Sequence, residues 1–345
     1  MRSMPANLYR EWALSSTTHM IKLPRRKFLY LAAGAAALSP MSCIAGAQAY
    51  PSRPVRIVVG FAAGGTQDIV ARLIGQWLAD RLGQPFIIEN RPGAASNIAA
   101  EVVVRAPADG QTLILVGVAN AINATLYEKL NFDFVRDIAP VAGIARMSNV
   151  LLVHPSFPAK TVAEFITYTK ANPGKISMAS AGIGSPSHMA GNLFEMMTGI
   201  NMIHIPYRGG APALTDLIGG QVQTHFGVTA SSVEYIRTGK LRALAVTTVS
   251  RLEALPDTPT VAEFVPGYEA STFYGVGAPK GTPTGVVDTL NKEINTALND
   301  PKIKARLADL GGTTLLGPAV DFGKLIADET EKWGKVIRAA NIKAE

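Results

Sequence analysis

One segment, Val55-Arg56-Ile57-Val58-Val59 with Gly60 to Thr66 directly after it, indicates the fold class of the mature chain. Its run of valine and isoleucine predicts a strand, and its glycines predict a tight turn. Apolar residues then recur at helical spacing from Ile69 to Leu82, and Gly83 ends that helix. A strand, a turn of small residues and a helix, in this order, are the repeating unit of largely parallel sheets.

Further units of the same kind follow along the chain. Strands are expected at 86–88, 111–116, 176–179 and 202–205, and helices at 97–104, 186–198 and from about 212. Glycine, serine and alanine fill the turns between them. The sequence therefore predicts an α/β protein in which helices surround largely parallel sheets.

The composition limits the partners. The chain has 345 residues, 48% of them hydrophobic, which is enough for a large core and for two domains. Its formal charge is +7, but residues 1–49 carry six basic side chains and one acid, so only +2 remains for the rest. No nucleic-acid partner is therefore expected. The single cysteine, Cys43, lies in the same leader, so the later chain has no thiol for a nucleophile, a disulfide or a metal site.

The first 49 residues are predicted to be an export signal peptide. Arg25 and Arg26 precede an apolar run from Leu29 to Leu38, and small residues follow up to Ala47-Gln48-Ala49. Cleavage after Ala49 would release the protein into the periplasm. The adjacent arginines suggest the twin-arginine export route, and the general secretory route stays open as an alternative. Translation could start at Met1, Met4 or Met20.

Four turns share one property: each brings the start of a helix to the end of a strand. The first amides of a helix have no internal acceptor and lie at the positive end of its dipole, so they can hold a carboxylate or a phosphate. For any single turn, the alternative is that a tight βα connection simply needs glycine. The turns are Gly64-Gly65-Thr66, Gly93-Ala94-Ala95-Ser96, Gly182 to Ser185, and Gly209-Gly210.

Several enzyme classes lack their motifs here. No G-x-x-x-x-G-K-[ST] occurs, and the run from Gly182 has a serine where the dinucleotide motif has its third glycine. Ser185 and His188 share a helix start, yet no G-x-S-x-G elbow is present, so a hydrolase is the weaker alternative. The histidines are too widely spaced for H-E-x-x-H. We therefore predict no catalytic residue, no metal and no cofactor.

Together these motifs resemble the extracytoplasmic solute receptors of the tripartite tricarboxylate transporter class, often called Bug receptors. The resemblance runs from about Tyr50 to the C-terminus. It is strongest in Arg53–Val59, Phe61–Asp68, Glu89–Gly93, Gly184–His188, Pro206–Leu214, Gly239–Thr247 and Leu255–Thr260.

The resemblance implies a periplasmic binding protein of type II, with two lobes that close like a Venus flytrap on a ligand in the cleft. Each lobe would be a mostly parallel sheet flanked by helices. Lobe 1 would comprise residues 50–152 and 272–345, and lobe 2 residues 153–271. A monomer would bind a small organic carboxylate and deliver it to the membrane subunits of a tripartite tricarboxylate transporter. A sensor for a signalling partner is an alternative with the same fold.

The resemblance also assigns the site. Phe61, Gly64, Gly65 and Thr66 match a loop that receives a carboxylate, in part through waters. Asp68 would repel an anion, so we expect it to cap backbone amides instead. The wall of lobe 2 and its adjoining loop match Ser180, Gly184, Ser185, His188, Tyr207, Gly209 and Gly210.

Two departures from the family pattern affect the ligand. This chain has Ala95-Ser96-Asn97 where family members commonly have Gly-Gly-Asn. The two side chains would narrow the space for the ligand, and Ser96 would add a hydroxyl to it. Gly227 stands where many members have an acid suited to an amino group, so a plain carboxylate is favoured over an amino acid. Arg72 and Arg208 are possible charged helpers, or else solvated side chains.

Overall fold

The computed structural model describes residues 50–127, 129–339 and 342–344. The chain divides into two compact units, Met1–Ala49 and Tyr50–Glu345. The predicted signal peptide, with its arginines, Cys43 and its cleavage site, lies outside the described residues. No helix in the described part is long and apolar enough to cross a bilayer.

The predicted strand-turn-helix units are present in the second unit. The first strand and helix are β1 (Val55–Val59) and α2 (Thr66–Leu82), and Gly83 ends α2 in the left-handed conformation with φ 71°. The helices expected at 97–104 and 186–198 occupy those residues as α3 and α7, and α8 begins at Gly210, slightly before its expected start.

The remaining elements are as follows. The strands are β2 (Phe86–Asn90), β3 (Thr112–Gly117), β4 (Ile138–Val153), β5 (Ser177–Ser180), β6 (Ile203–Pro206), β7 (Thr224–Val228), β8 (Arg242–Val246), β9 (Ser271–Pro279) and β10 (Gly312–Thr314). The helices are η1 (Ala94–Ser96), α3 (Asn97–Val104), α4 (Val118–Leu126), α5 (Phe134–Asp137), α6 (Val162–Ala171), α7 (Pro186–Thr198), α8 (Gly210–Ile218), α9 (Thr229–Arg237), η2 (Val261–Glu263), α10 (Thr284–Asn299), α11 (Pro301–Asp309) and α12 (Ala319–Ala339).

The strands form two sheets that share β4. Sheet A has the order β2-β1-β3-β9-β4, with β10 on β4, and sheet B continues as β4-β7-β5-β6, with β8 on β4. The long strand β4 pairs with β9 up to Ser148 and with β7 from Asn149 onward. The βαβ strands pair in parallel, whereas β9, β10 and the shared β4 pair with their neighbours in antiparallel fashion. The sheets are therefore mixed, because the chain passes between them along β4 and β9.

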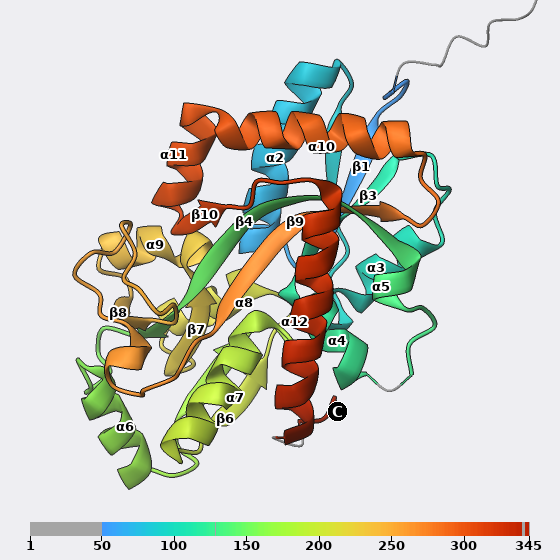
Figure 1. Cartoon of the computed structure of the whole chain (residues 1–345). Helices are drawn as coiled ribbons and strands as arrows, with labels where there is room; N and C mark the ends of the chain where they lie inside the picture. Colours follow the sequence, from blue (N-terminus) through green and yellow to red (C-terminus); the bar gives the residue numbers. More distant parts are fainter. Residues whose placement is uncertain (1–49, 128, 340–341, 345) are drawn as a thin grey trace, which may run out of the picture. The chain divides into compact units, whose positions relative to one another are not determined.

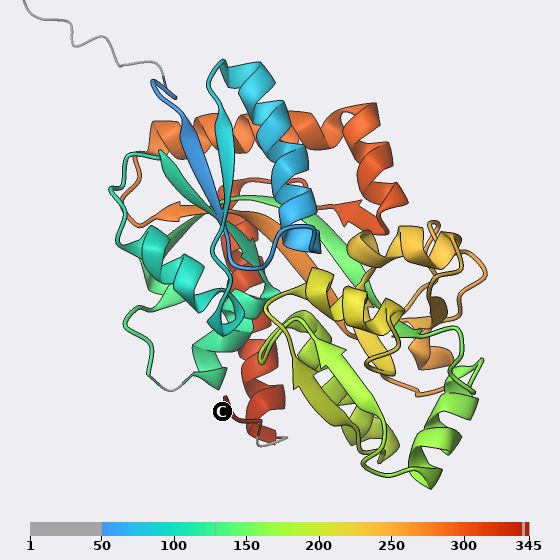
Figure 2. The same ribbon diagram turned by 180° about the vertical axis from the view of Figure 1, so that it is seen from behind.

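Helices cover both faces of each sheet. Figure 1 shows α12 in front of β9, and Figure 2, from behind, shows α2 in front of the strands. In sheet A, one core contains side chains of α2 and α10, and a second contains side chains of α3, α4 and α12. In sheet B, α6 and α7 pack on one face, and α8 and α9 on the other. The apolar runs that predicted the strands are buried between these helices.

The turn before α3 has an unusual backbone. Ala94, Ala95 and Ser96 all have positive φ, at 45°, 46° and 81°. The left-handed region costs an L-residue roughly 1–2 kcal/mol, and glycine avoids this cost. Ser96 is fully buried and packs against Gly60, where any side chain would overlap its Cβ and Oγ. Ser96 therefore fills the space beside Gly60, and the predicted narrowing of the ligand site stays a prediction.

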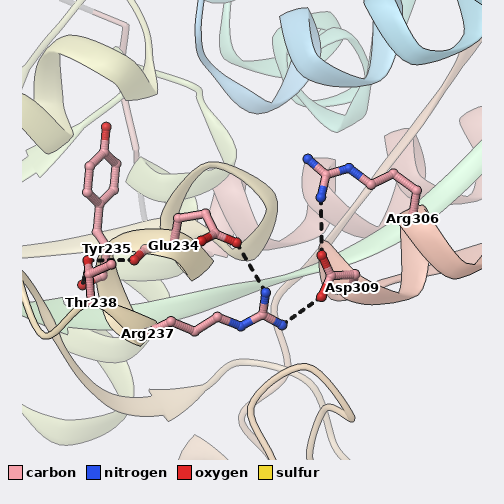
Figure 3. A network of polar contacts seen from close by, with 6 residues as sticks. All are labelled: Glu234, Tyr235, Arg237, Thr238, Arg306 and Asp309. Atoms are coloured by element: carbon pink, nitrogen blue, oxygen red, sulfur yellow. Dashed lines mark hydrogen bonds and ion pairs between the residues drawn. The ribbon is translucent and has the colours of Figure 1, made fainter.

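A network of ion pairs joins the last turn of α9 to α11 (Figure 3). Arg237 donates to Glu234 Oε1 at 3.1 Å and to Asp309 Oδ1 at 2.7 Å, and Arg306 donates to Asp309 Oδ2 at 3.1 Å. These side chains are well exposed, so each pair stabilises the fold only slightly. The network links a helix that packs on sheet B to one beside sheet A.

The strained turn yields the first prediction. Ala94→Gly removes an exposed methyl from a residue with φ 45°, so it is expected to raise the free energy of unfolding by roughly 0.5–1 kcal/mol, after the greater entropy of unfolded glycine is subtracted. The exposed Ala305 in the middle of α11 is the matched control, and its change to glycine should lower stability by about 1 kcal/mol. Chemical denaturation measures both. Equal destabilisation would refute strain at Ala94.

Candidate functional site

Four helices begin around one small cavity, which we call the inner cavity. The starts of α2, α7, α8 and α9 all contribute to its lining, although α2 packs on sheet A and the other three on sheet B. Its free volume is about 40 Å³, and a water needs roughly 10–15 Å³, so it has room for a few waters. The lining residues are Phe61, Gly65, Thr66, Gln67, Ala181, Pro186, Ser187, Gly210, His225, Val228, Ser231 and Tyr274.

The helix starts differ in whether their amides are occupied. In α7, Ser185 Oγ accepts from the His188 amide. The amides of the preceding turn are also occupied, because those of Ala181, Gly182 and Gly184 donate to side chains within residues 180–188. In contrast, α2, α8 and α9 have no side-chain cap. The free first-turn amides that can accept an anion therefore belong to α2, α8 and α9.

The starts of α2 and α8 lie against each other. A Cβ built on Gly65 would be 3.8 Å from the Gly210 amide nitrogen, and the Ala62 amide donates to Arg208 O at 3.2 Å. Figure 2 shows the start of α2, in blue, beside α8, in yellow. Thr66 Oγ1 also donates to Ser231 Oγ of α9 at 3.2 Å. Two uncapped helix dipoles thus have their positive ends at one point, which favours negative charge there.

Gln67 is a candidate site residue that the sequence analysis missed. It lies in the first turn of α2, is 5% exposed and lines the inner cavity, yet its buried Oε1 has no hydrogen-bond partner. A buried polar atom without a partner costs roughly 1–3 kcal/mol. This cost is recovered when a ligand or a water in the cavity donates to the amide. The side chain stood inside a quoted motif, but no sequence pattern distinguished it from a solvated glutamine.

Asp68 fixes the loop that precedes α2, as the sequence predicted. Its Oδ2 accepts from the Gly64 amide at 3.0 Å, and Arg72 binds both carboxylate oxygens at 2.9 Å. Burial raises the pKa of Asp68, but the hydrogen bonds from Arg72 and Gly64 outweigh it and hold this pKa below its usual value. Because Arg72 is engaged with Asp68, it does not serve as the charged helper of the site.

A second cavity, the outer cavity, adjoins the first. Both have Phe61 and Ala181 in their walls, and the outer one has a free volume of about 230 Å³. Among the described residues that line the two cavities, Arg208 is the single charged side chain, and none is an acid. The outer lining consists of Gly60, Phe61, Gly93, Ala94, Ala95, Tyr127, Ala181, Gly182, Ile183, Pro206, Tyr207 and Arg208.

The structure brings part of the predicted set together. Phe61, Gly65, Thr66, Tyr207 and Gly210 line the cavities, whereas ten others are not among the lining residues. These ten are Gly64, Asp68, Ser96, Asn97, Ser180, Gly184, Ser185, His188, Gly209 and Gly227.

Most of these ten residues have a visible supporting contact. Gly209 has φ 145° and packs on Ala62, which leaves no room for a Cβ. Asn97 Oδ1 accepts from Asn123 Nδ2 at 2.9 Å. Gly227 lies in β7 against Ser232, where a larger side chain would clash. That these residues also contact a ligand directly stays a prediction, which binding measurements on variants would test.

The geometry of Ser185 and His188 does not suit nucleophilic catalysis. Ser185 is fully buried, and its Oγ lies 3.1 Å from Ser187 Oγ while it caps the His188 amide. The imidazole Nδ1 of His188 accepts from the Gly184 amide and so cannot also take a proton from serine. Within the described residues, no group of three or more His, Cys, Asp or Glu side chains could hold a metal ion.

Two sheets joined by a long shared strand, with helix starts around a cavity between them, define a two-lobed α/β binding protein. Residues 70–342 match the model of the tripartite tricarboxylate transporter family receptor, TctC. The chain belongs to this family of periplasmic solute receptors.

Relatives and solved structures agree. The chain is 34% identical to BugT of Bordetella pertussis over 86% of its own length and 92% of that protein. A Rhodopseudomonas palustris protein solved with adipate is 38% identical, with a TM-score of 0.83 over 85% of this chain and 99% of that one. MatC of the same organism, solved with malate, is 34% identical, with a TM-score of 0.79 over 84% and 100%.

The unpaired glutamine yields the second prediction. Gln67→Met keeps the volume and removes the unpaired amide, so the unfolding free energy of the ligand-free protein should stay constant or rise by up to about 1–3 kcal/mol. Gln223 is the control, because its Oε1 accepts from the Ser177 amide at 2.9 Å and Gln223→Met should destabilise. Denaturation curves of both variants give the answer. If Gln67→Met lowered the free energy of unfolding as much as Gln223→Met, the side-chain amide of Gln67 would already have a hydrogen-bond partner.

Proposed function

We propose that this protein is a periplasmic receptor that binds a small organic carboxylate between its lobes and delivers it to the membrane subunits of a tripartite tricarboxylate transporter. The observation that carries the proposal is the meeting of uncapped helix starts at the inner cavity, beside the unpaired Gln67. A carboxylate that accepts several amide hydrogen bonds is stabilised as the anion without a counter-ion.

The charges around the cavities support a plain carboxylate. An ammonium group would need an acid, and the described residues of the two linings include none. His225 in the inner wall cannot supply charge at neutral pH, because burial lowers its pKa to about 4. The adipate and malate that two relatives bind are anions of this class.

Binding requires movement of the lobes. The inner cavity of about 40 Å³ is too small for a dicarboxylate, and contacts such as Ala62 N to Arg208 O close it. We infer that lobe 1, residues 50–152 and 272–345, separates from lobe 2, residues 153–271, to admit the ligand. The receptor acts as a monomer after removal of residues 1–49.

A ligand screen tests the proposal. Mono-, di- and tricarboxylates should raise the melting temperature of the mature protein, because a ligand that binds only the native state stabilises it. Gln67→Met should bind the same compounds at least about tenfold more weakly, since it lacks the amide that faces the cavity. Shifts confined to amino acids, sugars or cations would contradict the carboxylate assignment. Hydrolysis of esters that is lost in Ser185→Ala would favour the enzyme alternative.

Arg208 yields a further prediction on the ligand. A second carboxylate in the outer cavity would meet this guanidinium, so Arg208→Gln should weaken adipate binding by roughly tenfold to a hundredfold and leave hexanoate unchanged. Lys175→Gln is the matched control, because it removes an exposed charge away from both cavities. Calorimetry compares the four combinations. Equal weakening of adipate and hexanoate would assign Arg208 to general attraction of anions.

A further inference from the structure

Two histidines stack behind the loop that forms a wall of both cavities. His188 of α7 and His204 of β6 have ring centroids 4.1 Å apart and ring planes inclined by 23°. The wall loop, residues 180–187, supplies Ala181 and Ser187 to the inner cavity and Ala181 to Ile183 to the outer one. The sequence separation of the two histidines gave no sign that they meet.

Each imidazole holds a backbone group of the wall loop. The Gly184 amide donates to His188 Nδ1 at 3.1 Å. His204 Nε2 lies 2.6 Å from Ser180 Oγ, and this oxygen accepts from the Gly182 amide at 3.1 Å. The Gly184 amide is therefore held by His188 directly and the Gly182 amide by His204 through Ser180 Oγ, so the loop is held at two places.

This arrangement needs a neutral His188. Because Nδ1 accepts from Gly184, the single proton of the neutral ring is on Nε2, and it has an acceptor when the Asn192 amide, whose Nδ2 is placed 3.1 Å away, is turned so that its oxygen faces the ring. A second proton on Nδ1 would abolish the bond to Gly184 and place a charge beside His204. Burial, and then the nearby His204, lower the pKa of His188 to about 3.

The other titratable groups on the packed elements have their own partners. Glu195 of α7 accepts from the Met202 amide, and Asp216 of α8 accepts from Tyr207 Oη. His225 of β7 lies with its Nδ1 2.9 Å from Ala179 O. Among the described residues, no acid is hydrogen-bonded to His188, so a charge on this ring would not be offset there.

We propose that His188 and His204 are positioning residues, which hold the wall loop in its binding shape, and that the hold of His188 is released when this ring is protonated in acid. The inference rests on the proposed carboxylate-binding function. The unfolded state, with an ordinary histidine pKa near 6.5, takes up the proton first, so the stability of the closed loop is lost as the pH falls from about 6.5 toward 3. Ligand affinity falls with it.

Three variants test the inference. His204→Phe keeps the stacked ring but loses Nε2, so adipate should bind about tenfold more weakly at pH 7.5. His204→Gln restores a hydrogen-bonding group and should recover most of this affinity. It also removes the ring that, after burial, helps to lower the pKa of His188, so its loss of affinity in acid should begin at a higher pH than in the natural protein. His154→Gln is the control, because His154 is bonded in its own turn to Ser156.

Hydrogen exchange separates this inference from the proposed function. In the ligand-free protein, the Gly182 and Gly184 amides should exchange faster in His204→Phe than in the natural protein or in His154→Gln. Faster exchange supports the positioning role even if adipate does not bind at all, an outcome that would contradict only the receptor proposal. Unchanged exchange in His204→Phe, or an unchanged pH profile in His204→Gln, would overturn the inference.

Discussion

The free amide groups at the starts of α2, α8 and α9 are the constraint on which the site depends. A buried N–H group needs an acceptor, and these helices have no side chain that caps them. The fold brings their positive ends together from two sheets, so the carboxylate that we propose as the ligand would replace the missing caps. Asp68 and Arg72 serve the same arrangement indirectly, because they fix the loop whose last glycine begins α2.

The sequence predicted where the turns lie but not which of them have free amide groups. Strands, turns and helix starts follow from local patterns, and the bounds of α3 and α7 match their predicted ones. The availability of an amide depends instead on which side chain reaches it. The side chains of Ser185 and His188 accept hydrogen bonds from amides of their own turn, so these amides in the third predicted turn, Gly182 to Ser185, are not free for an anion. Such a hydrogen bond within a turn leaves no trace in periodicity or composition.

Residues far apart in sequence were beyond local reasoning. Tyr274 reaches the inner cavity from β9, which pairs with β3 and β4 rather than with the strands next to it in sequence. The stacking of His204 on His188 likewise joins a strand to a separate helix, and it depends on the register of β5 and β6. The family resemblance supplied the two-lobed fold, whereas the residues alone predicted only α/β units.

The ion pairs between α9 and α11 have a consequence for behaviour in different media. Arg237, Asp309 and Arg306 are exposed, so dissolved salt screens their attraction within a distance of about 10 Å at 0.1 M. The amides around the inner cavity are buried and are screened much less. Ionic strength therefore weakens the ion pairs between α9 and α11 and leaves the buried amides largely unaffected. In a bacterium in brine, these two helices would be held together less firmly than in fresh water, while the geometry of the cavity would stay the same.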